Sequence, residues 1–428
     1  MEAKMIKKIY DRFNENVYII KLKNGMQVHI LPKDDPYFTT YVELSVPYGA
    51  LDLNYKKNLE TIITPYGSAH FFEHKIFAMP DGDAFAKFSM LGADANAMTS
   101  YNQTSYLFVA TENVMESLAH LMDMMDTPFF TLDNVNQEKN IIAEELKMYL
   151  DDPNVVMQNK LMEMMYHVHP IRYDIGGTLD SIMDVTPEVI GGIYDTFYNP
   201  SNRLIVIAGK VDLNQIKAFF KDYDQKYPIK YKKPKTQYPK EPKKLVQKNI
   251  IEKMNVGIDK LMIGVKLVPK RLSSKEQIKK EMAMSMLMNI LLGNSSRVYA
   301  KLLEDKLINQ SFFVNVTYEK NAENIMIYAE SKHVRRLKKV LIELLTETAK
   351  NELTESAFLR YKKVYLGQFI FALNNLETKA YLYGKYHQMG SSLFEVVDLL
   401  QDITYQDVLF ALGLIEKKYI ATLIHKKA

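Results

Sequence analysis

The chain has 428 residues, a formal net charge of +4, 47% hydrophobic residues and 25% charged residues. These values are ordinary for a globular protein of two or three domains, and with no basic motif they give no support for a nucleic-acid partner. The absence of cysteine excludes disulfides and thiolate zinc sites. The first residues carry charges throughout, and no run approaches the roughly 18 apolar residues of a membrane span, so we expect a cytoplasmic protein without a membrane partner.

Alternating β-rich runs predict three strands near the start of the chain. Residues 17–23 and 26–32 flank an Asn-Gly pair, which favours a tight hairpin turn. Residues 38–48 predict a third strand. A loop containing Pro65 and Gly67 then leads into a helix.

The helix predicted over residues 67–77, GSAHFFEHKIF, carries the residues with the clearest chemistry. Residues three and four apart share one helix face, so His70, Glu73 and His74 project together. Two imidazoles one turn apart can bind one zinc ion, and a carboxylate beside the second can activate a water molecule. This order, HxxEH, is the inverse of the commoner HExxH motif. A third ligand has to come from another element.

The best source of a third ligand is the stretch QEKNIIAEELKMYLDDP at residues 137–153, whose apolar spacing predicts a helix. Glu138 and Glu145 fall on one face of it, about 10 Å apart along the axis, so both cannot bind one ion directly. One would be a ligand and the other would orient the site. Glu144, adjacent to Glu145, is an alternative ligand.

Together these motifs resemble the pitrilysin/insulinase family of zinc metallopeptidases: HxxEH is followed about seventy residues later by a glutamate, which has another glutamate seven residues before it. The resemblance favours Glu145 over Glu144, because Glu145 begins the ELKM run and keeps the seven-residue step. It implies one Zn²⁺ per chain and the following roles: His70, His74 and Glu145 as ligands, Glu73 as general base, and Glu138 as a supporting carboxylate.

The resemblance also implies a site for the peptide substrate. Residues 93–111 predict two strands separated near Asn102, and the first of them contains Asn96 and Ala97. In the family such an Asn-Ala pair lies at a sheet edge beside the zinc. An exposed edge offers unpaired N–H and C=O groups, so a peptide or unfolded segment would bind there as an added strand.

The remaining elements predict an α+β fold with two similar domains, each a mainly antiparallel sheet flanked by helices on one face. A zinc-bearing domain is expected over residues 1–228 and a Lys/Pro-rich linker over residues 229–247. A second domain without a metal motif follows over residues 248–428. It begins with a strand at 257–269, and we expect helices from residue 338 to the end.

One departure from the family pattern points to a partner. Active members carry an arginine and a tyrosine seven residues apart in the later domain, which stabilise the developing oxyanion. Here the corresponding residues are Leu303 and Gln310. The resemblance therefore implies a heterodimer with a related subunit that supplies the missing Arg/Tyr pair. A homodimer is the second choice, since it would lack the pair on both sides.

We therefore predict a zinc-dependent metalloendopeptidase subunit. The alternative is a non-proteolytic structural or peptide-binding subunit of the same fold. In the peptidase hypothesis Glu73 acts as the base and binds no metal. A non-proteolytic subunit would have no need of this residue, so the presence of Glu73 favours the enzyme.

Overall fold

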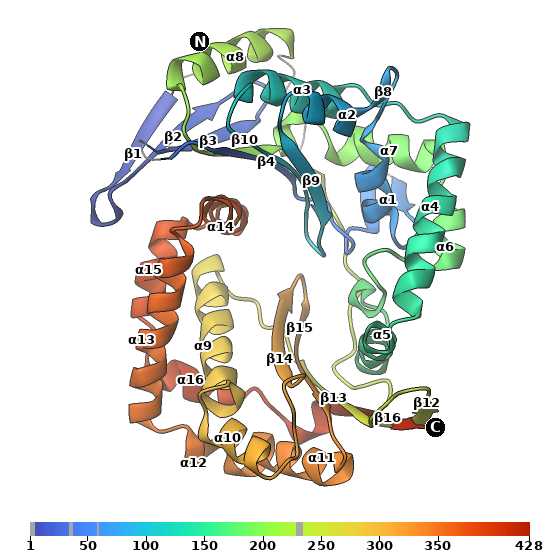
Figure 1. The fold of residues 1–428 in the computed structure, drawn as a ribbon, viewed down its shortest axis with the longest axis vertical. Helices are drawn as coiled ribbons and strands as arrows, with labels where there is room; N and C mark the ends of the chain where they lie inside the picture. The colour runs from blue at the N-terminus through green and yellow to red at the C-terminus, as the bar shows by residue number, and fades with distance from the viewer. Residues whose placement is uncertain (1–4, 34–36, 58–59, 228–233) are drawn as a thin grey trace. The chain divides into compact units, whose positions relative to one another are not determined.

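The computed structural model describes residues 5–33, 37–57, 60–227 and 234–428, which form two compact units (Figure 1). The units are not consecutive parts of the chain, in contrast to the predicted division at residues 228 and 248. Unit 1 comprises Met1–Leu146, Asp174–Gln237 and Ala372–Phe394. Unit 2 comprises Lys147–Tyr173, Tyr238–Phe371 and Glu395–Ala428. Each unit thus contains a segment from the other half of the sequence.

Unit 1 is built on a seven-stranded sheet of order β1-β2-β3-β11-β4-β10-β9. Its strands are β1 (Met5–Tyr10), β2 (Glu15–Lys21), β3 (Gln27–Pro32), β4 (Thr40–Val46), β9 (Asp94–Thr99), β10 (Thr104–Ala110) and β11 (Leu204–Gly209). Strands β3 and β11 are parallel, and the other described pairs are antiparallel. The mainly antiparallel prediction and the β2–β3 hairpin are confirmed. Two small hairpins outside this sheet were not predicted: β5 (Asn54–Lys57) with β6 (Glu60–Ile63), and β7 (Ala78–Met79) with β8 (Gly82–Asp83).

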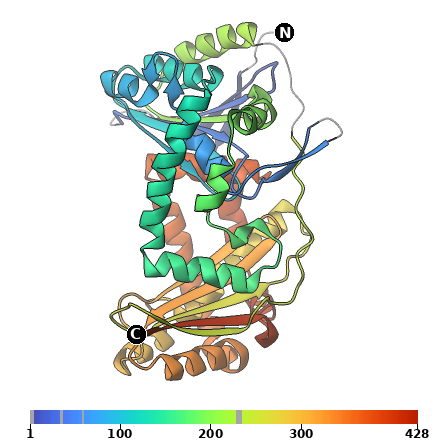
Figure 2. The same cartoon turned by 90° about the vertical axis from the view of Figure 1, so that its right-hand side faces the viewer.

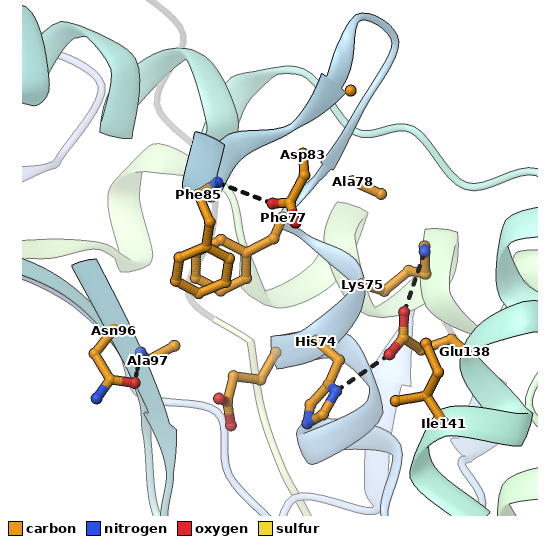
Figure 3. Close-up of a pocket in the computed structure, with 12 residues that line it drawn as sticks. His74, Lys75, Phe77, Ala78, Asp83, Phe85, Asn96, Ala97, Glu138 and Ile141 are labelled. Carbon is orange, nitrogen blue, oxygen red and sulfur yellow. Dashed lines mark hydrogen bonds and ion pairs between the residues drawn. The ribbon is translucent and has the colours of Figure 1, made fainter. Parts of the chain in front are cut away.

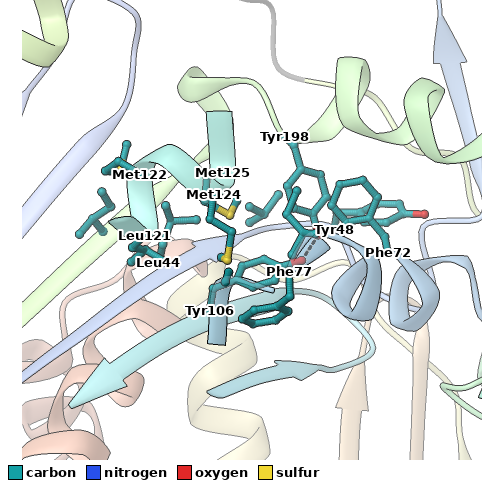
Figure 4. Packing of buried hydrophobic residues seen from close by; sticks show 14 of the residues in the cluster. Leu44, Tyr48, Phe72, Phe77, Tyr106, Leu121, Met122, Met124, Met125 and Tyr198 are labelled. Atoms are coloured by element: carbon teal, nitrogen blue, oxygen red, sulfur yellow. Dashed lines mark hydrogen bonds between the residues drawn. The ribbon is translucent and has the colours of Figure 1, made fainter. Parts of the chain in front are cut away.

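Helices cover one face of this sheet and enclose the core. They are α1 (Ser68–Lys75), α2 (Ala84–Met90), α3 (Val114–Asp126), α4 (Leu132–Leu150), α6 (Leu179–Met183), α7 (Pro187–Phe197) and α8 (Leu213–Lys226). Leu44 on β4 and Phe72 on α1 are fully buried in this core (Figure 4). The hydroxyl groups of Tyr106 and Tyr198 lie within it, 2.9 Å apart, and satisfy each other by a hydrogen bond.

The opposite face of the same sheet is covered by α14 (Leu376–Gln388), a helix that the sequence did not place there (Figure 1). Side chains that alternate with the core residues along the strands meet this helix. Tyr383 Oη lies 2.7 Å from His29 Nδ1, and Gln388 donates to the Ser45 hydroxyl at 2.9 Å. The contact therefore includes polar pairs beside apolar ones, such as Gly384 of α14 against Val206 of β11.

Unit 2 has a five-stranded sheet of order β12-β16-β13-β15-β14. Its strands are β12 (Asn249–Met254), β13 (Lys260–Leu267), β14 (Phe313–Glu319), β15 (Ala322–Glu330) and β16 (Ile420–Lys427). The prediction of helices to the end of the chain is wrong, because the last strand pairs with both β12 and β13. The α+β class itself is confirmed.

The helices that belong wholly or mainly to unit 2 are α5 (Pro153–Met165), α9 (Ser274–Leu292), α10 (Arg297–Glu304), α11 (Val334–Glu343), α12 (Ala349–Glu352), α13 (Glu355–Ala372), α15 (Leu393–Gln401) and α16 (Tyr405–Leu412). Helix α5 packs on β13 at Gly264, where an added Cβ would lie 2.6 Å from Met165 Sδ (Figure 2). Throughout the described ranges, no helix is both long and apolar enough to cross a bilayer.

Residues 229–233 of the predicted linker lie outside the described residues. Its later part is anchored to unit 2. The Glu241 carboxylate accepts hydrogen bonds from the three backbone N–H groups of residues 167–169, each at 2.9 Å, and from the Lys266 ammonium at 2.6 Å. This part of the chain is therefore fixed by charge-assisted hydrogen bonds rather than acting as a free tether.

A buried charge cluster beneath α14 yields a test of the fold. Glu15 Oε1 accepts from Lys379 at 2.7 Å and from Lys33 at 2.5 Å. In Glu15→Gln both ammonium groups lose their counter-charge, so we expect the free energy of unfolding to fall by about 3 kcal/mol, measured by urea denaturation. The matched control is Asp195→Asn, which breaks the exposed pair with Lys57 and should cost less than about 1 kcal/mol. Equal losses in the two variants would contradict this assignment.

Candidate metal centre

Helix α1 places the HxxEH residues because its other face is buried. It begins after Gly67, whose φ of +83° suits glycine. Phe71 and Phe72 are fully buried in the core of unit 1. His70 and His74, one turn apart, therefore face away from the core, and their ring centroids lie 4.6 Å apart.

Helix α4 places both predicted glutamates in the same way. Ile142 and Leu146 are buried on the side that faces the core, and Glu138 is also buried. Glu145 is partly buried, with 23% of its side chain exposed, whereas Glu144 is exposed. The helical spacing thus turns Glu145 toward α1 and leaves Glu144 on the surface.

His70, His74 and Glu145 form one cluster, as predicted. Each offers a ligand atom within 4.8 Å of the others, and among the residues that the structure describes this is the one group of at least three His, Asp or Glu side chains close enough to hold a metal ion. His70 Nε2 lies 3.8 Å from Glu145 Oε1, and His74 Nε2 lies 3.6 Å from Glu145 Oε2.

These separations fit a zinc ion. Nitrogen and oxygen ligands about 2.1 Å from zinc in tetrahedral geometry lie about 3.4 Å from each other. The distances of 3.6 and 3.8 Å are longer than hydrogen bonds and close to that ligand–ligand spacing. Two imidazoles and one carboxylate also match the donor set of catalytic zinc sites, which keep a fourth position open.

Glu138, the other glutamate predicted on α4, contacts the His74 imidazole as expected for a supporting carboxylate (Figure 3). Its Oε1 lies 3.1 Å from His74 Nδ1, and its Oε2 accepts from Lys75 at 3.4 Å. Burial would raise the pKa of Glu138, but the hydrogen bond from His74 and the charge of Lys75 outweigh it and hold that pKa below its ordinary value. Since an ionised carboxylate only accepts, His74 Nδ1 donates, and its Nε2 is left for the cluster.

The pKa values of the two histidines are shifted in opposite directions. Burial, aided by the charge of His74, lowers the pKa of His70, which favours the neutral ring that a metal requires. Burial also acts to lower the pKa of His74, but Glu138 raises it above its ordinary value. His70 Nδ1 is buried and has no hydrogen-bond partner among the described residues.

The pair Gly176 and Gly177 fits against the start of α1. A Cβ added to Gly177 would lie 2.5 Å from the Tyr66 carbonyl oxygen, and one added to Gly67 would lie 2.2 Å from the Gly176 carbonyl oxygen. Two backbone segments can approach this closely only where side chains are absent. The turn thereby fixes the position of His70.

Glu73 lies beside the three-residue cluster and outside it. Its Oε2 accepts a hydrogen bond from the Thr99 hydroxyl at 2.6 Å. Thr99 ends β9, the edge strand of the sheet. The sequence reasoning missed this residue, because a threonine at a strand end carries no distinctive signal.

A cavity of about 440 Å³ adjoins Glu73 and His74 and includes the predicted substrate-binding pair (Figure 3). Asn96 and Ala97 on β9 form part of its wall, and Phe77 and Phe85, stacked with ring centroids 4.1 Å apart, form another part. All seven predicted site residues therefore lie in or beside one region of unit 1.

Comparison with known proteins identifies the family. The chain is 36% identical over 409 residues to a protein of Bacillus subtilis named "Uncharacterized zinc protease YmfH", and the match covers 94% of this chain and 95% of that one. The family model for insulinase (peptidase family M16) matches residues 63–179. The chain belongs to this family. It is also 26% identical to the zinc protease PqqE of Helicobacter pylori, over 86% of this chain and 82% of the relative.

Solved structures of M16 proteins have the same architecture. The M16-like peptidase of Alicyclobacillus acidocaldarius matches with a TM-score of 0.89 and 26% identity over the full length of both chains. Pitrilysin matches with a TM-score of 0.70 and 15% identity, over 100% of this chain and 46% of that one, and shows the fold alone. A second M16 model, described as the inactive domain, matches residues 184–365, where HxxEH is absent.

Metal binding tests the choice between neighbouring glutamates. Glu145→Gln removes a ligand charge, so we expect the zinc dissociation constant, measured by competition with a chelator, to rise by about 100-fold or more. Glu144→Gln is the matched control and should change it by less than about threefold. Glu138→Gln should give an intermediate rise of about 10- to 100-fold. A larger effect at Glu144 than at Glu145 would overturn the assignment.

Proposed function

We propose that this chain is the zinc-bearing subunit of a metalloendopeptidase that completes its active site with a related partner subunit. The observation that carries the proposal is the placement of Glu73 beside the His70, His74 and Glu145 cluster, at the edge strand β9. Family membership and the names of the zinc protease relatives support it. Cytoplasmic location stays a prediction.

The residues divide the chemistry between them. One zinc ion held by His70, His74 and Glu145 would supply Lewis-acid polarisation of a peptide carbonyl and make a water molecule more acidic. The Glu73 carboxylate would accept the proton of the attacking water and pass it to the leaving amine. Glu138 would keep His74 in the tautomer that presents Nε2.

The peptide would bind as an extended strand on β9. The Ala97 N–H donates to the Asn96 side-chain oxygen at 2.8 Å, and because β9 is the edge strand of its sheet we expect this N–H to face the open edge. A substrate carbonyl would displace the Asn96 side chain from this N–H. Main-chain recognition of this kind depends little on substrate side chains.

The need for a partner rests on two positions in unit 2. Leu303 lies on α10 and Gln310 follows that helix, and both are exposed. Leucine has no donor for an oxyanion, and a lone amide does not replace a guanidinium and a phenol. A related subunit that carries an arginine and a tyrosine at these positions would supply the donors, whereas a second copy of this chain would not.

The test combines the purified chain with each related chain from the same organism and follows cleavage of quenched fluorescent peptides, with subunit composition measured by light scattering. We expect cleavage only in a heterodimer. Glu73→Gln should reduce kcat by about 100-fold or more with zinc content unchanged, because only the proton acceptor is removed. Glu144→Gln serves as the control. If zinc binds but no pairing cleaves any peptide in a Glu73-dependent manner, the protein is a non-proteolytic subunit.

The edge-strand proposal has its own test. Ala97→Pro removes the N–H that faces the open edge, a position where a sheet tolerates proline. We expect KM for peptides to rise about tenfold or more, with zinc content unchanged. Asn96→Ala removes the competing acceptor and should leave KM unchanged or lower it. An Ala97→Pro variant with the KM of the wild type would exclude this binding mode.

A further inference from the structure

The hydrogen bond from Thr99 to Glu73 connects the proposed base to the proposed substrate strand. The donor is a hydroxyl at the end of β9, and the acceptor is Oε2 of the glutamate on α1, at 2.6 Å. This is the length of a charge-assisted O–H···O⁻ bond, which is roughly twice as strong as a neutral one.

The strand end that carries Thr99 is itself held in place. Thr99 pairs in register with Thr104 on β10, and the Thr104 hydroxyl donates to the Tyr48 carbonyl oxygen at 2.9 Å. Thr104 and Tyr48 are both buried. The hydroxyl that reaches Glu73 therefore comes from a well-anchored part of the sheet.

Glu73 needs such a restraint. Its side chain is only partly buried, and an unrestrained glutamate side chain can adopt several rotamers. It lies between the two histidines in the sequence, so a released carboxylate could turn toward the ion that they would bind. A carboxylate that served as a ligand could not also serve as a base.

We propose that Thr99 is a positioning residue. By holding Oε2 it keeps the carboxylate out of the ligand cluster and leaves Oε1 to take the proton of the attacking water. This inference rests on the proposed function. Because Thr99 and Ala97 are two residues apart on one strand and share a face, the same strand would fix both the peptide and the base.

Kinetic measurements on Thr99 variants distinguish a positioning role of its hydroxyl from a role of the side chain in packing. Thr99→Val keeps the shape and removes the donor, so we expect kcat to fall by about 10- to 100-fold, as misplaced catalytic groups do, while KM changes by less than about twofold. Thr99→Ser retains the hydroxyl and should recover most of the lost kcat. Zinc content and thermal stability serve as controls for both variants. A Thr99→Val enzyme with wild-type kcat, or a Thr99→Ser enzyme as impaired as Thr99→Val, would overturn the proposal.

A second readout needs no turnover. The visible spectrum of protein loaded with Co²⁺ alone reports the number and geometry of ligands. Thr99→Val should change this spectrum, and the double variant Thr99→Val/Glu73→Gln should match Glu73→Gln, because the effect runs through the carboxylate. If the spectrum responds in this way but no peptide is cleaved, the positioning role stands and the proposed function fails. If peptides are cleaved but neither kcat nor the spectrum responds to Thr99→Val, the positioning role fails alone.

Discussion

The candidate metal centre depends on how two amphipathic helices, α1 and α4, pack against one core. Phe71 and Phe72 bury one face of α1, and Ile142 and Leu146 bury one face of α4. Each helix then has a single face left for polar groups, so two histidines on one helix meet a glutamate on the other. Apolar burial of these side chains, worth roughly 1.5–3 kcal/mol each, thus brings together polar side chains that would otherwise be separately hydrated in water.

Electrostatic interactions orient the histidine side chains that helix packing brings together. Glu138 is buried beside His74 and Lys75, and its ionised form directs one imidazole nitrogen away from the cluster. His70 Nδ1 has no hydrogen-bond partner among the described residues, and His70 is positioned instead by the close backbone approach at Gly67 and Gly177. The two histidines are therefore fixed by different means, one by a charged hydrogen bond and one by shape.

Much of this was predictable from the sequence. The helical repeat determines which side chains share a face, so the spacing within HxxEH and along the Glu138 helix was enough to group these residues. Thr99 was not predictable, because its role arises from a contact between a strand end and a helix 26 residues earlier in the chain. Helix α14 was missed as a cover for the first sheet, since it follows more than 160 residues after the last strand of that sheet and local patterns do not indicate which sheet a helix covers. The last strand was also not predicted. It is buried between β12 and β13, and that pairing depends on the tertiary structure and not on the local sequence.

We assign His70, His74 and Glu145 as the ligands of one zinc ion. Anomalous diffraction from crystals of the zinc-loaded protein, collected on both sides of the zinc absorption edge, would locate this ion. We expect one strong peak per chain, about 2.0–2.2 Å from both histidine Nε2 atoms and from a Glu145 carboxylate oxygen. A zinc peak elsewhere, or one bound by Glu73 in place of Glu145, would contradict this assignment.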